Sequence, residues 1–166
     1  MKLLGPLNSY LPYLLNRAGA RIATAFGEEV RPLGASLQSW RVLAALRERD
    51  GRRMGDLSET TSIEVSTLTR LVDGMERKGL VARRPAPGDA RAVALWLTAA
   101  GERLTARIVP LAERYEKVAL AGFGRQETDV LKQALRRLYD NIGKLERPSR
   151  LSPSRALRSR RRASPP

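Results

Sequence analysis

Apolar residues recur every three or four positions over most of the chain, which is the spacing of amphipathic helices. The first run extends from about Ser9 to Val30, and the segment Arg31-Pro32-Leu33-Gly34 that follows it is suited to ending a helix. A second run begins after Ser36, a good N-cap residue, and stops at Asp50-Gly51. The residues expected to face inward on this second helix are Trp40, Leu43, Ala44 and Leu46. The pattern therefore predicts one long helix and one short helix.

Two further short segments have helical character. Met54 to Thr60 precedes a break at Thr61-Ser62, and a strongly amphipathic run then ends at Lys78-Gly79, where the glycine suits the C′ position of a helix. The apolar residues of that run, expected to face the core, are Val65, Leu68, Leu71, Val72 and Met75. The chain is thus predicted to contain three short helices in succession.

The period then changes to two, which is the period of a β-strand. Leu80 to Arg84 and Ala92 to Leu97 are rich in β-prone residues. The residues of the second run that are spaced to share one face are Val93, Leu95 and Leu97. The intervening segment, Pro85 to Arg91, has two prolines and a glycine, so we expect a hairpin whose loop projects from the body.

Two longer helices complete the pattern. Thr98 is placed to cap a helix that runs towards Ala121, with a kink expected near Pro110 because an interior proline removes a backbone hydrogen bond. Gly122 to Gln126 turns the chain into a last helix. The apolar stripe of this helix consists of Val130, Leu131, Leu135, Leu138, Ile142 and Leu145. The predicted fold is mainly α with a small β-hairpin, and long helices bracket the short ones.

Charge changes this picture at one end of the chain. Of the 166 residues, 31 are Lys or Arg and 17 are Asp or Glu, which gives a formal net charge of +14 and favours a polyanionic partner. Residues 147–166 are rich in Arg, Ser and Pro and contain no acidic residue. We expect residues 1–146 to form one domain and the tail to be disordered, either as a solvated extension or as a DNA-binding arm.

The chain has no cysteine and no histidine. This composition excludes thiolate chemistry, disulfides, imidazole bases and the commonest zinc ligands. The remaining reactive residues form no recognisable catalytic cluster, so we expect neither an enzyme nor a metal or cofactor site. No stretch of about 18 apolar residues occurs, which predicts a soluble, cytoplasmic protein without a membrane partner.

Short helices joined by a tight break and followed by a hairpin are typical of a winged helix-turn-helix, here predicted over about residues 36–97. A helix fits the major groove of DNA, and a hairpin loop can reach the neighbouring minor groove. The outward residues of the third short helix, expected to contact DNA, are Ser66, Thr67, Thr69, Arg70, Asp73 and Arg77. Hydroxyls near a helix N-terminus can bind phosphates, and Arg70 can bind a guanine through two hydrogen bonds.

Three segments carry a resemblance to a known family. The residues from Leu57-Ser58 through Ser66 to Arg84, the later Asp89-Ala90-Arg91 and the run Leu97-Thr98-Ala99-Ala100-Gly101 resemble the MarR family of bacterial transcriptional regulators. The resemblance implies a regulator, expected to be a repressor, that binds a pseudo-palindromic operator in double-stranded DNA. It also implies a homodimer in which helices at about 9–30 and 98–146 interlock and leave two winged lobes for DNA.

The same resemblance assigns roles in the wing. It implies that Arg91 enters the minor groove, that Asp89 helps to orient the wing's arginines, and that Arg84 also belongs to the DNA-binding set. Residues two apart in an extended loop share a side, so an ion pair between Asp89 and Arg91 is expected. Two positions depart from the family pattern, because Val65 stands where a basic residue is frequent and Gly124 replaces a usual serine.

Many members of the family are released from DNA by small aromatic acids that bind between the dimerisation helices and the winged lobe. The residues expected to line such a site here are Tyr13, Asn16, Trp40 and Arg41. Core packing of Trp40 and solvation of Arg41 are the alternatives. For the whole chain, the alternative function is nonspecific binding of nucleic acid by a basic architectural or RNA-associated protein.

Overall fold

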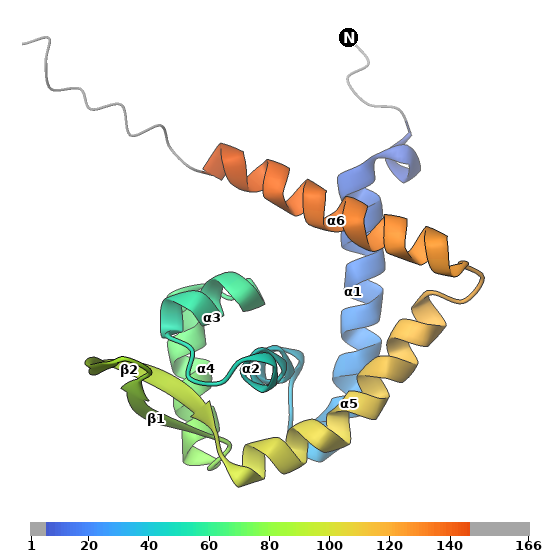
Figure 1. Cartoon of the computed structure of the whole chain (residues 1–166). Coiled ribbons are helices and arrows are strands. Elements are labelled where there is room, and N and C mark those ends of the chain that lie inside the picture. The colour runs from blue at the N-terminus through green and yellow to red at the C-terminus, as the bar shows by residue number, and fades with distance from the viewer. Residues whose placement is uncertain (1–5, 147–166) are drawn as a thin grey trace, which may run out of the picture. The chain divides into compact units, whose positions relative to one another are not determined.

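The computed structural model describes residues 6–146, which fall into two compact units that divide between Ala121 and Gly122. The first unit begins with a 3-10 turn, Leu7–Ser9, and the long helix α1, Leu11–Val30. The elements that follow α1 are a 3-10 turn (Arg31–Leu33), α2 (Leu37–Glu48), α3 (Met54–Thr61), α4 (Val65–Arg77), β1 (Val81–Ala86), β2 (Asp89–Leu97) and α5 (Ala99–Ala119), as Figure 1 shows. The second unit contains α6, Arg125–Glu146. The predicted mainly helical fold with one small hairpin is confirmed, and the expected tail lies outside the described residues.

Local capping explains where several elements begin and end. Ser36 caps α2 as predicted, because its Oγ accepts a hydrogen bond from the Ser39 amide at 3.1 Å while its own amide donates to Ser39 Oγ at 2.8 Å. Thr98 caps α5 through a bond from the Gly101 amide at 3.1 Å. Gly79, predicted at the C′ position of α4, has a φ of +66°, a conformation that glycine adopts without strain. These ends are therefore encoded by neighbouring residues.

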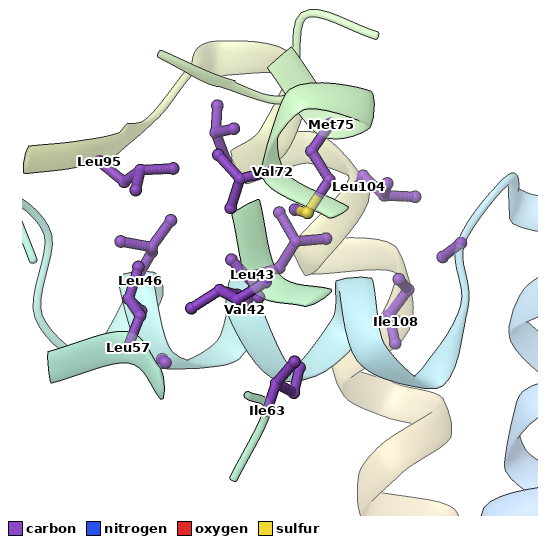
Figure 2. Packing of buried hydrophobic residues seen from close by; sticks show 14 of the residues in the cluster. Val42, Leu43, Leu46, Leu57, Ile63, Val72, Met75, Leu95, Leu104 and Ile108 are labelled. Atoms are coloured by element: carbon purple, nitrogen blue, oxygen red, sulfur yellow. The ribbon is translucent and has the colours of Figure 1, made fainter. Parts of the chain in front are cut away.

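The first unit is built on one hydrophobic core around α2. Figure 2 shows Val42, Leu43 and Leu46 of α2 facing side chains from the surrounding elements. The labelled residues that α3, α4, β2 and α5 contribute include Leu57, Val72, Met75, Leu95, Leu104 and Ile108. Because every element of the helix-turn-helix packs on α2, the core fixes α4 and the hairpin relative to each other.

Two residues expected to face inward are exposed. Val65 is 47% exposed, because the packing of α4 against the core begins one turn later, at the buried Leu68. Val93 is 57% exposed, whereas both Ala94 and Leu95 are buried. All three residues lie in the regular part of the ladder with β1, so Val93 is exposed because it lies nearer the tip of the hairpin, beyond the core that Leu95 joins.

The long helices carry much exposed apolar surface. Pro110 lies inside α5 as expected, and this helix changes direction along its length in Figure 1. The large hydrophobic residues exposed on α1, near the end of α5 and on α6 include Leu11, Leu14, Ile22, Val118, Val130, Leu135 and Ile142. Among the described helices, none is long and apolar enough to cross a membrane.

Candidate nucleic-acid interface

The helix-turn-helix is closed by a tight turn between α3 and α4. Ser62 has a φ of +54°, the left-handed conformation that reverses the chain within a few residues. Ser58 fixes this turn, because its hydroxyl donates to the Ile63 carbonyl at 2.7 Å while its own carbonyl accepts from the Ile63 amide at 3.3 Å. The turn directs α4 across the core and leaves one face of that helix in solvent.

The exposed face of α4 carries most of the residues expected to contact DNA. The residues of the predicted set that are exposed there are Ser66, Thr67, Thr69, Arg70 and Arg77. They lie opposite Leu68, Val72 and Met75, which are buried. Arg70 Nε donates a long hydrogen bond of 3.4 Å to the Ser66 carbonyl, and Thr69 Oγ1 donates to the Val65 carbonyl at 2.8 Å. The helix thus presents hydroxyls and guanidinium groups together.

The carboxylate of Glu64 caps the N-terminus of α4. The carboxylate of Glu64 accepts hydrogen bonds from the amides of Ser66 at 2.9 Å and Thr67 at 3.2 Å, and from the Ser66 hydroxyl. The Ser66 hydroxyl bond, followed by the two amide bonds and the nearby charge of Arg70, lowers the pKa of Glu64 below its usual range. These two amides, which at a free helix N-terminus could bind a phosphate, are therefore already paired with Glu64.

Asp73 has a partner inside the protein. Its carboxylate forms an ion pair with Arg83 of β1 at 2.6 Å, and the same guanidinium pairs with Glu76. The Arg83 amide also donates to Glu76 at 3.1 Å. The hydrogen bond with Asp73, opposed by burial and reinforced by Glu76, raises the pKa of Arg83 above its ordinary value. Sequence reasoning missed Arg83 and Glu76; their opposite charges on neighbouring elements were the available signal.

The hairpin differs from the expected one in length and shape. The strands pair regularly from Val81 with Leu97 to Pro85 with Val93, but the next pair joins Ala86 to Asp89. The loop is therefore reduced to Pro87-Gly88, and residues 90–92 form an irregular stretch within β2. Arg91 lies in this stretch and is exposed, not in a projecting loop. Arg84 is exposed on β1.

The prediction of an ion pair between Asp89 and Arg91 is wrong. One carboxylate oxygen of Asp89 pairs with Arg53, which directly precedes α3, at 3.0 Å. The other oxygen accepts a hydrogen bond from the backbone amide of Arg91 at 3.1 Å. Asp89 thus holds the backbone of the wing, while the guanidinium of Arg91 is left to solvent. Arg53 was missed because 36 residues separate it from Asp89.

Comparisons with known proteins agree with this geometry. A model of the MarR family matches residues 33–92. A crystal structure of a MarR-family transcriptional regulator from Silicibacter pomeroyi is similar, with 33% sequence identity and a TM-score of 0.74 over 82% of this chain and 92% of that one. The chain belongs to the MarR family of transcriptional regulators. It is accordingly a DNA-binding regulator, as the sequence predicted.

Two further relatives of this regulator have informative names. The transcriptional repressor NicR of Pseudomonas putida is 26% identical over 130 residues, which cover 78% of this chain and 82% of NicR. BpsR of Bordetella bronchiseptica, whose DNA binding is regulated by 6-hydroxynicotinic acid, is 26% identical with a TM-score of 0.69. That match covers 78% of this chain and 98% of BpsR.

The residues expected to bind a ligand in this regulator are only partly brought together. Trp40 and Arg41 line a cavity of about 430 Å³. The other lining residues come from α2 and from the end of α3, and they are Ala44, Ala45, Glu48, Thr60, Thr61 and Ser62. Tyr13 and Asn16 on α1 are not among them. Trp40 also packs on Phe26 with ring centroids 6.0 Å apart, so it contributes both to the core and to the cavity wall.

Proposed function

We propose that this regulator binds a pseudo-palindromic operator as a homodimer and represses transcription there until a small aromatic acid releases it. The observation that carries the proposal is the joint exposure of Arg70 on α4 and Arg91 on the wing, two elements that Arg83 links through Asp73 and Glu76. A regulator of transcription acts where the DNA is, so the proposed location is the cytoplasm.

In this proposal α4 reads bases in the major groove. Arg70 and Arg77 supply guanidinium groups, and the hydroxyls of Thr67 and Thr69 lie near them on the exposed face. Ser66 and Asp73 act within the interface while bound to Glu64 and Arg83, respectively. On the wing, Arg91 enters the minor groove, Arg84 contacts the backbone, and Asp89 orients the segment.

The proposed homodimer is supported by the exposed apolar residues of the long helices. Leu11 and Leu14 on α1 are exposed, as are Leu135 and Ile142 on α6. Exposed apolar surface of this extent in a soluble regulator is typical of protein interfaces. A second copy of the chain is the proposed cover, because two copies related by twofold symmetry match the symmetry of a pseudo-palindromic operator.

The proposed effector binds in the cavity of Trp40 and Arg41. The indole of Trp40 offers a flat apolar surface for an aromatic ring, and the exposed Arg41 offers a cation for a carboxylate. The similarity to BpsR, which responds to 6-hydroxynicotinic acid, supports this ligand class, and the similarity to NicR supports repression. Tyr13 and Asn16 lie outside the cavity, so the proposal rests on Trp40 and Arg41.

Selection of random duplex DNA on the purified protein tests the proposed function. We expect enrichment of one inverted repeat, whereas a basic nonspecific binder would enrich no common sequence. On the selected operator, Arg70→Ala should weaken binding by about 1–3 kcal/mol and relax one base pair per half-site. Arg91→Ala should weaken it at least about tenfold. Arg103→Ala, which removes an exposed charge from α5, is the control and should leave specificity unchanged.

A further inference from the structure

The connector between α2 and α3 forms part of the wing. The Arg52 carbonyl accepts a hydrogen bond from the Leu95 amide at 2.8 Å, so Arg52 pairs with β2 as a short third strand. Two residues further along each segment, Asp50 Oδ1 accepts a hydrogen bond from the Leu97 amide at 2.9 Å. These two bonds, one to a backbone carbonyl and one to a side-chain carboxylate, attach the base of β2 to the helix-turn-helix.

The tip of the wing lies against the same connector. Gly51 has a φ of +69°, and a Cβ on this residue would come within 2.8 Å of the Trp96 ring and 3.1 Å of Pro87 Cγ. The turn residue Pro87 and the indole of Trp96 therefore both pack where Gly51 lacks a side chain. Trp96 Nε1 is buried there without a hydrogen-bond partner among residues 6–146. The hairpin is thus folded back over the connector.

A second contact joins the connector to the wing tip. Arg53 Nη2 lies 3.0 Å from Asp89, whose other carboxylate oxygen accepts from the Arg91 amide. Residues 90–92 are displaced from the regular ladder with β1, so that ladder does not set the backbone position of Arg91. In its place, Arg91 is positioned by Asp89, and Asp89 by Arg53.

We propose that Gly51 and Arg53, here called the wing seat, are positioning residues that set where Arg91 meets DNA. Arg53 directly precedes α3, so the wing seat ties the wing tip to the helix-turn-helix and fixes the spacing between Arg91 and the base-reading Arg70. An exposed ion pair adds little stability, so its effect is on orientation. The inference rests on the proposed role of Arg91 in DNA binding.

Charge exchange tests the ion pair of the wing seat. Arg53→Asp and Asp89→Arg should each lower the ratio of operator affinity to random-DNA affinity by about two- to fivefold, the range expected for an exposed ion pair. The double variant has the net charge of the natural protein and the reversed pair, but an arginine at position 89 cannot accept a hydrogen bond from the Arg91 amide. It should therefore recover only the part of the ratio that the ion pair contributes, and its ratio should exceed that of Asp89→Arg alone. A double variant that is no better than Asp89→Arg would overturn the role of Arg53, because loss of the Asp89 carboxylate alone predicts no recovery. A net-charge effect would instead change operator and random-DNA affinity together and leave their ratio unchanged.

A matched pair of glycine variants tests the packing. Gly51→Ala adds a methyl group against Trp96 and Pro87, whereas Gly34→Ala has a similar φ of +78° with no atom within 4 Å of the new Cβ. In a Trp40→Phe background, Trp96 is the single tryptophan, and its fluorescence emission reports the packing of its ring against Gly51. We expect Gly51→Ala to shift the fluorescence emission of Trp96 to longer wavelength in the free protein and to lower the ratio of operator affinity to random-DNA affinity. Gly34→Ala should change neither quantity. Equal behaviour of the two variants would overturn the proposal.

Arg91→Ala distinguishes this inference from the proposed function. If Arg91→Ala binds the operator as the natural protein does, the DNA role of Arg91 is wrong, and the positioning role fails with it. If Arg91→Ala loses affinity while Gly51→Ala, Arg53→Asp and Asp89→Arg do not, the wing seat alone is wrong. Loss of operator preference in all four variants, with recovery on charge exchange, supports both the DNA role of Arg91 and the positioning role of the wing seat.

Discussion

Gly101 shows how a single atom limits one position of the fold. A Cβ on this residue would collide with the backbone carbonyl oxygen of Leu80, which lies beside the first turn of α5. The residue thus lets α5 start directly against the base of β1. Its place in the run Leu97 to Gly101 was visible in the sequence, but the reason was not, because Leu80 and Gly101 meet only in the folded chain.

We expect Gly101→Ala to lower the free energy of unfolding by about 1–3 kcal/mol, since the backbone of α5 or β1 must move to admit the methyl group. Urea denaturation monitored by circular dichroism measures this loss. Gly55→Ala is the control, because Gly55 lies on the exposed side of α3 with no atom within 4 Å of a new Cβ. It should be neutral or slightly stabilising. Equal losses in the two variants would show that the collision is relieved without cost.

Glu64 gives a second prediction at the scale of one residue. Its pKa is lowered in the folded protein from an ordinary value of 4.5, first by the Ser66 hydroxyl bond and then by the amides of Ser66 and Thr67. The ionised carboxylate therefore stabilises the fold fully above pH 4.5, and this contribution is lost as the pH falls through the lower folded-state pKa. Glu64→Gln should lower the melting temperature at pH 7, and the difference should shrink on acidification below that range.

Thermal melts at several pH values measure this difference. Glu59→Gln removes the same charge from an exposed residue of α3 that caps no helix, and it should lower the melting temperature less at pH 7. A difference between Glu64→Gln and the natural protein that stays constant from pH 7 to pH 3 would mean that the carboxylate is not what caps α4.

At the scale of elements, Arg83 joins the wing to α4. Its guanidinium pairs with Asp73 and Glu76, and its side chain is 31% exposed. We expect Arg83→Gln to lower the free energy of unfolding by about 1 kcal/mol, a value that allows for solvent screening of the pairs. The neighbouring Arg84 is exposed and makes no ion pair with other described residues. Arg84→Gln should therefore leave stability unchanged while weakening DNA binding. Equal stability losses in the two variants would show that the ion pairs of Arg83 do not hold the wing to α4.

Elements were predicted from the sequence where their signals are local. Ser36, Thr98 and Gly79 mark helix ends through residues three or four positions away, and the structure places those ends as expected. The third strand at Arg52 and the pairing of Arg53 with Asp89 were not predicted, because they join segments more than 30 residues apart. The candidate DNA-facing residues of α4 followed from its period, whereas the internal partners of Ser66 and Asp73 did not.

At the scale of the whole molecule, the sequence predicted apolar stripes on the long helices without showing what covers them. Leu135 illustrates the point, because it belongs to the predicted stripe of α6 and is 40% exposed in the single chain. A charge introduced at a residue buried within one chain would destabilise the fold of that chain. A charge introduced at an exposed residue would mainly weaken association, and only if a second chain covers that residue. This difference separates an interface residue from a core residue by experiment.

We expect the natural protein to sediment as a dimer at micromolar concentration and Leu135→Asp to shift it towards monomers, since the carboxylate would be buried without a partner in the proposed interface. Circular dichroism should remain helical, because the side chain is exposed within one chain. Gln133→Asp places the same charge on an exposed polar position of α6 and is the matched control. A monomeric natural protein would contradict the proposed dimer. Leu135→Asp should also lose affinity for the complete inverted repeat far more than for a single half-site, because linking two winged lobes adds an effective concentration that a monomer lacks.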